Sequence, residues 1–151
     1  MTMLIKNLNQ AFIQRHQTAL ACLFILFTLF ATPAMARQAV PIIQYDNIPI
    51  VSTQKLDTAQ VLQAIKLGAA SQHWVISNVE NGALNATILV RQKHTVVVHI
   101  KYDTDKYSIH YQDSTNMKYE KSSDGQAIIH PFYNKWVAAL NDAIRLELSK
   151  H

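Results

Sequence analysis

The middle of the chain alternates apolar with polar residues, a pattern typical of strands that bury one face. Residues 95–111 hold two runs rich in β-branched and aromatic side chains, on either side of a polar turn at residues 103–106. Residues 73–79 and 84–91 alternate in the same way around Asn81-Gly82, a pair that favours a tight hairpin turn because both residues tolerate a positive φ. We therefore expect a four-stranded antiparallel meander with strands at residues 73–79, 84–91, 95–102 and 106–112.

Helical periodicity appears on both sides of the predicted meander. Asp57 or Thr58 provides an N-cap for a helix over residues 59–70, and Pro131 suits the first turn of a second helix within residues 128–150. The apolar stripe of the first helix is Val61, Leu62, Ile65 and Ala69, and that of the second is Tyr133, Trp136, Val137, Leu140, Ile144 and Leu148. Asn141 lies off the second stripe, among the polar residues.

The segment before the first helix contains Pro41 and Pro49 among apolar side chains. Proline opposes a helix, and the segment is too apolar for a disordered tail, so we expect an extended arm over residues 37–56 that packs at an edge. The predicted fold class is α+β: a four-stranded antiparallel β-meander with two helices packed on one face, plus an extended N-terminal arm. Residues 57–151 form its single domain.

The alternation assigns each strand residue to one face of the sheet. The richer apolar face, which we expect under the helices, collects Val75, Val79, Leu84, Ile88, Val90, Val96, Val98, Ile100, Ile109 and Tyr111. The other face carries an apolar patch of Trp74, Ile76, Leu89 and Val97 beside His99 and His110. Three interpretations of the patch stay open: the arm covers it, a second copy or another protein binds it, or it lines a concave ligand cleft.

His99 and His110 are the candidate residues for chemistry. If Tyr102 pairs with Tyr107 across the turn, the two histidines lie directly opposite each other, close enough to share a metal ion or a proton. Zinc, however, takes three or four protein ligands, and no close ligand motif accompanies the pair. The sequence therefore assigns no metal ligand and no cofactor, and two strand histidines without a ligand remain the simpler interpretation.

The first 36 residues have the order of a secretory signal peptide. Lys6 and Arg15 precede an apolar run at residues 19–31, and Ala34-Met35-Ala36 matches an A-x-A cleavage site. The run is short for a membrane span, which needs roughly 20 residues, so we expect cleavage rather than an uncleaved anchor. The mature protein is then periplasmic and keeps no stable membrane span.

Charge and cysteine content exclude several classes of protein. After residue 36 the chain has twelve basic and ten acidic residues, a net charge of +2 that is too small and too evenly spread for a nucleic-acid partner. The only cysteine, Cys22, lies in the predicted signal, so the mature protein has no disulfide and no thiolate site. The sequence has no G-x-S-x-G elbow and no phosphate-binding glycine loop, and we assign no catalytic residue.

Several strings resemble those of a group of small exported proteins and lipoproteins of Gram-negative bacteria. The strings run over residues 111–119 (YQDSTNMKY) and 129–136 (IHPFYNKW), with Trp74 upstream. The resemblance implies an envelope location and supplies no catalytic residue. Side chains from both strings are expected to tie the connection at residues 113–125 to the second helix: Ser114, Asn116, Tyr119, His130, Tyr133 and Asn134.

The sequence thus favours a non-catalytic periplasmic binding or protein-interaction module rather than an enzyme. Its expected partner is an envelope protein or a small ligand, and a homodimer is possible. The alternative is a small metal-dependent or acid–base enzyme that uses His99 and His110.

Overall fold

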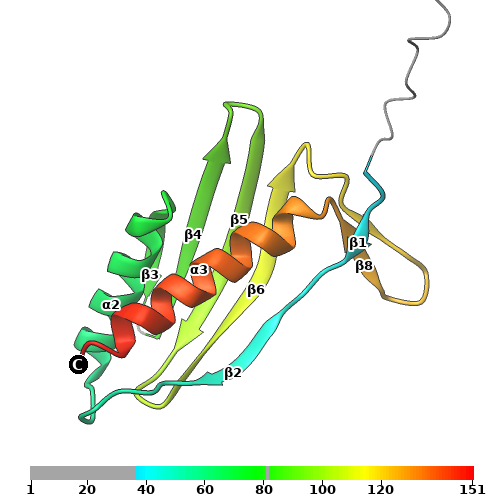
Figure 1. Ribbon diagram of the computed structural model, residues 1–151. Helices are drawn as coiled ribbons and strands as arrows, with labels where there is room; N and C mark the ends of the chain where they lie inside the picture. The colour runs from blue at the N-terminus through cyan, green and yellow to red at the C-terminus, as the bar shows by residue number, and fades with distance from the viewer. Residues whose placement is uncertain (1–36, 81) are drawn as a thin grey trace, which may run out of the picture. The chain divides into compact units, whose positions relative to one another are not determined.

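The computed structural model describes residues 37–80 and 82–151, and the predicted signal peptide lies outside them. Five antiparallel strands form the main sheet in the order β2-β6-β5-β4-β3 (Figure 1). Their bounds are β2 Tyr45–Pro49, β3 Val75–Glu80, β4 Ala83–Val90, β5 His94–Tyr102 and β6 Lys106–Thr115. Strands β3 to β6 are the predicted meander, and β2, which belongs to the predicted arm, adds a fifth strand at the edge of the sheet.

A second antiparallel sheet has the order β1-β8-β7 and consists of β1 (Val40–Pro41), β7 (Glu120–Lys121) and β8 (Ala127–Ile129). The α+β class and the antiparallel pairing are confirmed, but the single four-stranded sheet is wrong. The difference arises because the arm is not merely laid on the body. Its backbone hydrogen-bonds in β1 to β8 and in β2 to β6, so it becomes part of both sheets.

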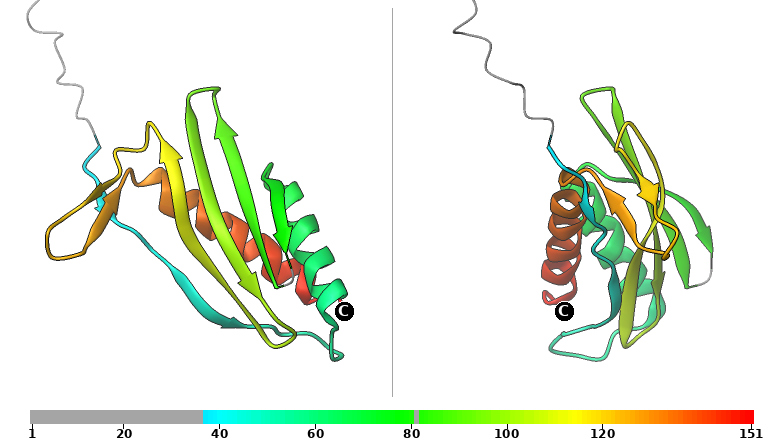
Figure 2. Two further views of the ribbon diagram at one scale, coloured as in Figure 1. Left: turned by 180° about the vertical axis from the view of Figure 1, so that it is seen from behind. Right: turned by 90° about the vertical axis from the view of Figure 1, so that its right-hand side faces the viewer.

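Two helices lie on one face of the five-stranded sheet (Figure 2). Helix α2 (Thr58–Ser71) begins in a capping box, in which the Asp57 carboxylate accepts from the Gln60 amide and the Gln60 side chain accepts from the Asp57 amide. Helix α3 (Phe132–Leu148) follows Pro131, as the sequence predicts. The helices meet at Gly68, where an added Cβ would lie 2.8 Å from the Ile144 Cα.

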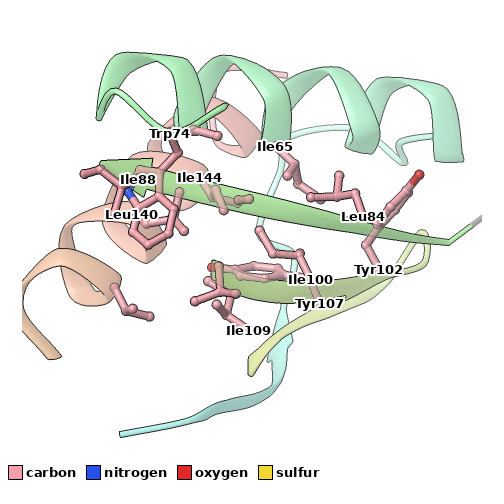
Figure 3. Close-up of a cluster of buried hydrophobic side chains, with 14 of the residues drawn as sticks. Ile65, Trp74, Leu84, Ile88, Ile100, Tyr102, Tyr107, Ile109, Leu140 and Ile144 are labelled. Atoms are coloured by element: carbon pink, nitrogen blue, oxygen red, sulfur yellow. The ribbon is translucent and has the colours of Figure 1, made fainter. Parts of the chain in front are cut away.

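The core lies between the helices and the covered face of the sheet (Figure 3). From the sheet it takes six predicted inward residues, all buried: Leu84, Ile88, Val96, Val98, Ile100 and Ile109. From α3 it takes Tyr133, Val137, Leu140, Ile144 and Leu148 of the predicted stripe. Asn141, predicted on the polar side, is also buried, because its Oδ1 accepts a 2.7 Å hydrogen bond from the Tyr107 hydroxyl.

The predicted faces fail in one strand, β3. Val75 and Val79 are exposed, whereas Trp74 is 3% exposed and belongs to the core. The cause is an irregularity between Ser77 and Glu80, where Asn78 has φ +47° and shifts the pairing of Val75 from the expected Ile88 to Thr87. One extra residue in a strand reverses the face of every residue on its far side. Gly82 has the positive φ (78°) that a tight hairpin turn requires, and Asn81 lies outside the described residues.

Candidate functional site

The predicted apolar patch is divided between the two faces of the sheet. Leu89 (59% exposed) and the half-buried Val97 lie on the open face, away from the helices. Trp74 and Ile76 pack against the core on the covered face, because the irregularity at Asn78 turned them over. A patch of Trp74, Ile76, Leu89 and Val97 is therefore wrong as a unit.

Val75 takes the place of Trp74 on the open face. It is 69% exposed, and strand pairing puts it beside Thr87, which in turn pairs with Val97. Leu89 lies two residues along β4 from Thr87. We call Val75, Thr87, Leu89 and Val97 the open-face patch. The sequence signal that could have found Val75 is Asn78, since asparagine adopts a positive φ more readily than most residues and is common where a strand is irregular.

The arm does not cover this patch. Strand β2 pairs with β6, at the edge of the sheet opposite to β3, and Ile42, Tyr45, Ile48 and Ile50 of the arm pack against the core. The interpretation in which the arm lies over the patch is therefore wrong, while the expectation that the arm forms an edge piece is confirmed.

The predicted pairing of His99 with His110 is confirmed, and both side chains lie half-buried on the open face. Each ring has one further partner. The His99 Nδ1 lies 2.8 Å from the Oδ1 of Asn85 on β4, and the His110 Nε2 lies 2.5 Å from the Oδ1 of Asp46 on β2. Four side chains from four adjacent strands thus form one row, Asp46–His110–His99–Asn85, which we call the histidine row.

The histidine row forms a polar binding surface, and its hydrogen bonds to Asn85 and Asp46 use only one ring nitrogen of each histidine. Among residues 37–80 and 82–151 there is no cluster of three or more metal-ligating side chains. The nearby Ser108 Oγ accepts a hydrogen bond from the Asn47 amide (2.9 Å), an arrangement that ties β2 to β6. Lys101 also lies on this face, two residues along β5 from His99 and opposite Ser108.

The six polar residues expected at the end of the sheet have mainly structural contacts. Asn134 accepts from the Ile43 amide (3.0 Å) and donates to the Pro41 carbonyl (2.9 Å), so it fixes the arm to α3. The His130 Nδ1 accepts from the Phe132 amide (3.2 Å) at the start of α3, and burial lowers the His130 pKa. These bonds support the structural role of this end of the sheet.

Aromatic rings complete the same region. Tyr119 stacks on Tyr111 at 4.4 Å between ring centroids, Tyr133 meets Tyr111 edge-on at 5.7 Å, and Asn116 donates to the Lys93 carbonyl (2.7 Å). The Tyr111 hydroxyl also lies 3.0 Å from the Ser114 Oγ. Burial raises the pKa of Tyr111 and of Tyr133 above their usual value. Burial thus favours the neutral phenol of Tyr111 and Tyr133 over the charged phenolate, as expected for packing residues.

The clefts of the described residues lie mainly beside α3. One of about 330 Å³ has walls that include Pro49, Val51 and Leu146. Another, of about 560 Å³, has walls that include Ser71, Ala139 and Leu146. A third cleft, of about 210 Å³, has walls that include Lys101 and Ser108. None of the three is lined by the open-face patch or by the histidines, so these clefts give no support to the interpretation in which the patch lines a concave site.

Comparison with protein-family models, with curated proteins and with solved structures gave no match for this chain. Within the residues that the structure describes, none of the helices has both the length and the apolar character needed to cross a bilayer.

Proposed function

We propose that this protein is a non-catalytic module of the bacterial periplasm that binds a partner protein through the open face of its five-stranded sheet. Export is supported by the signal-peptide pattern of residues 1–36. The observation that carries the binding role is the uncovered open-face patch, with Val75 at 69% and Leu89 at 59% exposure beside the histidine row.

The composition of this face favours a protein over a small ligand. Sites for small molecules are concave and enclose most of the ligand, whereas protein interfaces combine an apolar centre with a polar, hydrogen-bonding rim. On this face the apolar centre is the open-face patch, and the polar rim includes Asn85, His99 and Lys101. The side chains of the histidine row are already held by hydrogen bonds to one another, so they lose little entropy when a partner binds.

The alternative, a small metal-dependent or acid–base enzyme using His99 and His110, has weaker support. Acid–base catalysis needs a group that orients substrate near the base, and the two histidines lie on an open sheet surface rather than in one of the clefts beside α3. We therefore place the histidines in a binding surface.

Site-specific photocrosslinking tests the binding role. Leu89 is replaced by the photoreactive residue p-benzoylphenylalanine, and the protein is irradiated in the periplasm of its own cell. The matched control carries the same residue at position 146, because Leu146 is equally exposed (60%) but belongs to α3. We expect a discrete crosslinked band from position 89 that position 146 does not give, and the same band from position 75.

Mass spectrometry of that band identifies the occupant. A band that contains a different envelope protein supports the proposal, whereas a band that contains two copies of this chain replaces the partner protein by a homodimer. Diffuse labelling from both 89 and 146, or none from either, would refute a specific binding role for the open face.

A further inference from the structure

The hydrogen bonds of the histidine row determine which imidazole nitrogens remain free. Asn85 Oδ1 and Asp46 Oδ1 only accept hydrogen bonds, so the ring nitrogens that contact them, His99 Nδ1 and His110 Nε2, must each carry a hydrogen. In a neutral imidazole the second nitrogen then has an unshared electron pair. The ring nitrogens that can donate an electron pair to a metal ion are therefore the His99 Nε2 and the His110 Nδ1.

The order of the strands determines where these two donors lie. Asn85 is on β4 and Asp46 on β2, which flank the central pair β5 and β6. The two nitrogens of an imidazole point in roughly opposite directions. Because the protonated nitrogens of both rings are tied outward, toward β4 and β2, the free ones turn toward the space between β5 and β6. His99 and His110 are directly opposed there, with Cβ atoms about 4.5–5.5 Å apart in such a pair.

This is the arrangement by which proteins prepare histidine to hold a metal ion. A metal-ligating imidazole almost always donates its other N–H to a carboxylate or carbonyl oxygen, which fixes the tautomer and the ring orientation. Both histidines of the row have such a partner before any metal binds. A pair of solvent-exposed strand histidines with no ligand needs neither of these two hydrogen bonds.

We propose that His99 and His110 form an open two-imidazole site for a divalent transition-metal ion, with Cu²⁺ bound most tightly. Imidazole nitrogen suits copper, nickel and zinc, and affinity at a given site rises to its maximum at Cu²⁺ in the first-row series. Zinc is less well served because it takes three or four protein ligands, and among the described residues no group of three or more His, Cys, Asp or Glu side chains is placed to hold a metal ion. Waters complete the coordination of the copper ion. The Lys101 ammonium opposes binding, but it sits on an exposed, flexible side chain at the next position of this face.

Titration of the purified protein with CuSO₄, without a histidine tag, tests the site. Calorimetry should give one saturable equivalent, and pulsed electron paramagnetic resonance should detect two imidazoles bound to the copper ion. His99→Gln and His110→Gln should each abolish the saturable binding. His73→Asn is the matched control, because His73 is an exposed histidine outside the row with φ +62°, which asparagine tolerates.

The orienting residues provide a second, independent measurement. Asn85→Leu removes the hydrogen-bond acceptor of His99 without touching the metal, and loss of such a partner typically costs about 10–100-fold in metal affinity. Circular dichroism confirms that each variant is folded. Absence of saturable binding in the parent protein, or equal affinity in the parent and the H99Q/H110Q double variant, would overturn the proposal. This site does not depend on the partner-binding role, since the copper titration uses the purified protein alone, with no partner present.

Discussion

The contact between the two helices at Gly68 gives the sharpest test of the packing. A Cβ added at this position would lie 2.8 Å from the Cα and the N of Ile144 and 3.0 Å from the carbonyl carbon of Ala143. All three atoms belong to the backbone of α3, so no side chain can rotate out of the way. Gly68→Ala therefore forces α2 and α3 apart over the core.

Two opposing effects set the size of the change. Alanine in a helix interior is favoured over glycine by about 1 kcal/mol. Overpacking of a core costs about 1–3 kcal/mol, and the rigid obstacle here places Gly68→Ala near the upper end. We expect a net loss of about 2 kcal/mol in the free energy of unfolding, or a fall in Tm of roughly 8 °C for a domain of this size.

Urea denaturation followed by circular dichroism measures this loss, and the same helix supplies the control. Gln63 is exposed on α2, so Gln63→Ala and Gln63→Gly differ by helix propensity alone. That pair should favour alanine, while position 68 favours glycine. If Gly68→Ala is as stable as the parent protein or more stable, the close approach of the helices at Gly68 is refuted.

The buried tyrosines yield two further predictions. Tyr107→Phe leaves the Oδ1 of buried Asn141 without its donor and should cost about 1–3 kcal/mol of stability. Tyr133→Phe instead removes a buried hydroxyl with no partner among the described residues, and it should leave stability equal or raise it by about 1 kcal/mol. Urea midpoints of the two variants compare them directly, and an equal loss in both would contradict the assignment. Burial also raises the pKa of Tyr107 and Tyr133 above the value of 10.0 for an exposed tyrosine, so the unfolded chain loses these protons first. Stability should be complete below about pH 10 and should fall above it by about 1.4 kcal/mol per pH unit for each tyrosine. A Y107F/Y133F double variant should show a shallower fall between pH 9 and 11, and an identical slope would argue against burial as the cause.

Local pattern was sufficient for most of the secondary structure. The Asp57 cap, the stripe of α3 and the strands of the hairpin β5–β6 each arise from residues close together in the chain, where periodicity and capping have direct physical causes. The opposition of His99 and His110 was predictable for the same reason, because a short turn fixes the register of a hairpin.

The partners of the histidines were not predictable in this way. Asp46 is 64 residues from His110 in the sequence, and it reaches the row only because β2 pairs with β6. The contact of Asn85 with His99 could be predicted only from the register of β4 against β5. The burial of Asn141 was not predictable either, because its hydrogen-bond partner, Tyr107, belongs to a strand that is distant in the sequence.

The sequence by itself determined the two amphipathic helices, the four strands β3 to β6 and the opposed histidine pair. Only the tertiary structure decided which face Trp74 and Val75 occupy, since the irregularity at Asn78 exchanges the two faces for the residues that precede it. It also decided that the arm becomes part of both sheets, because strand pairing is a hydrogen-bonding choice between segments far apart in the chain. Alternation gives each strand two faces, but the identity of the buried face depends on register and on the helices that cover it.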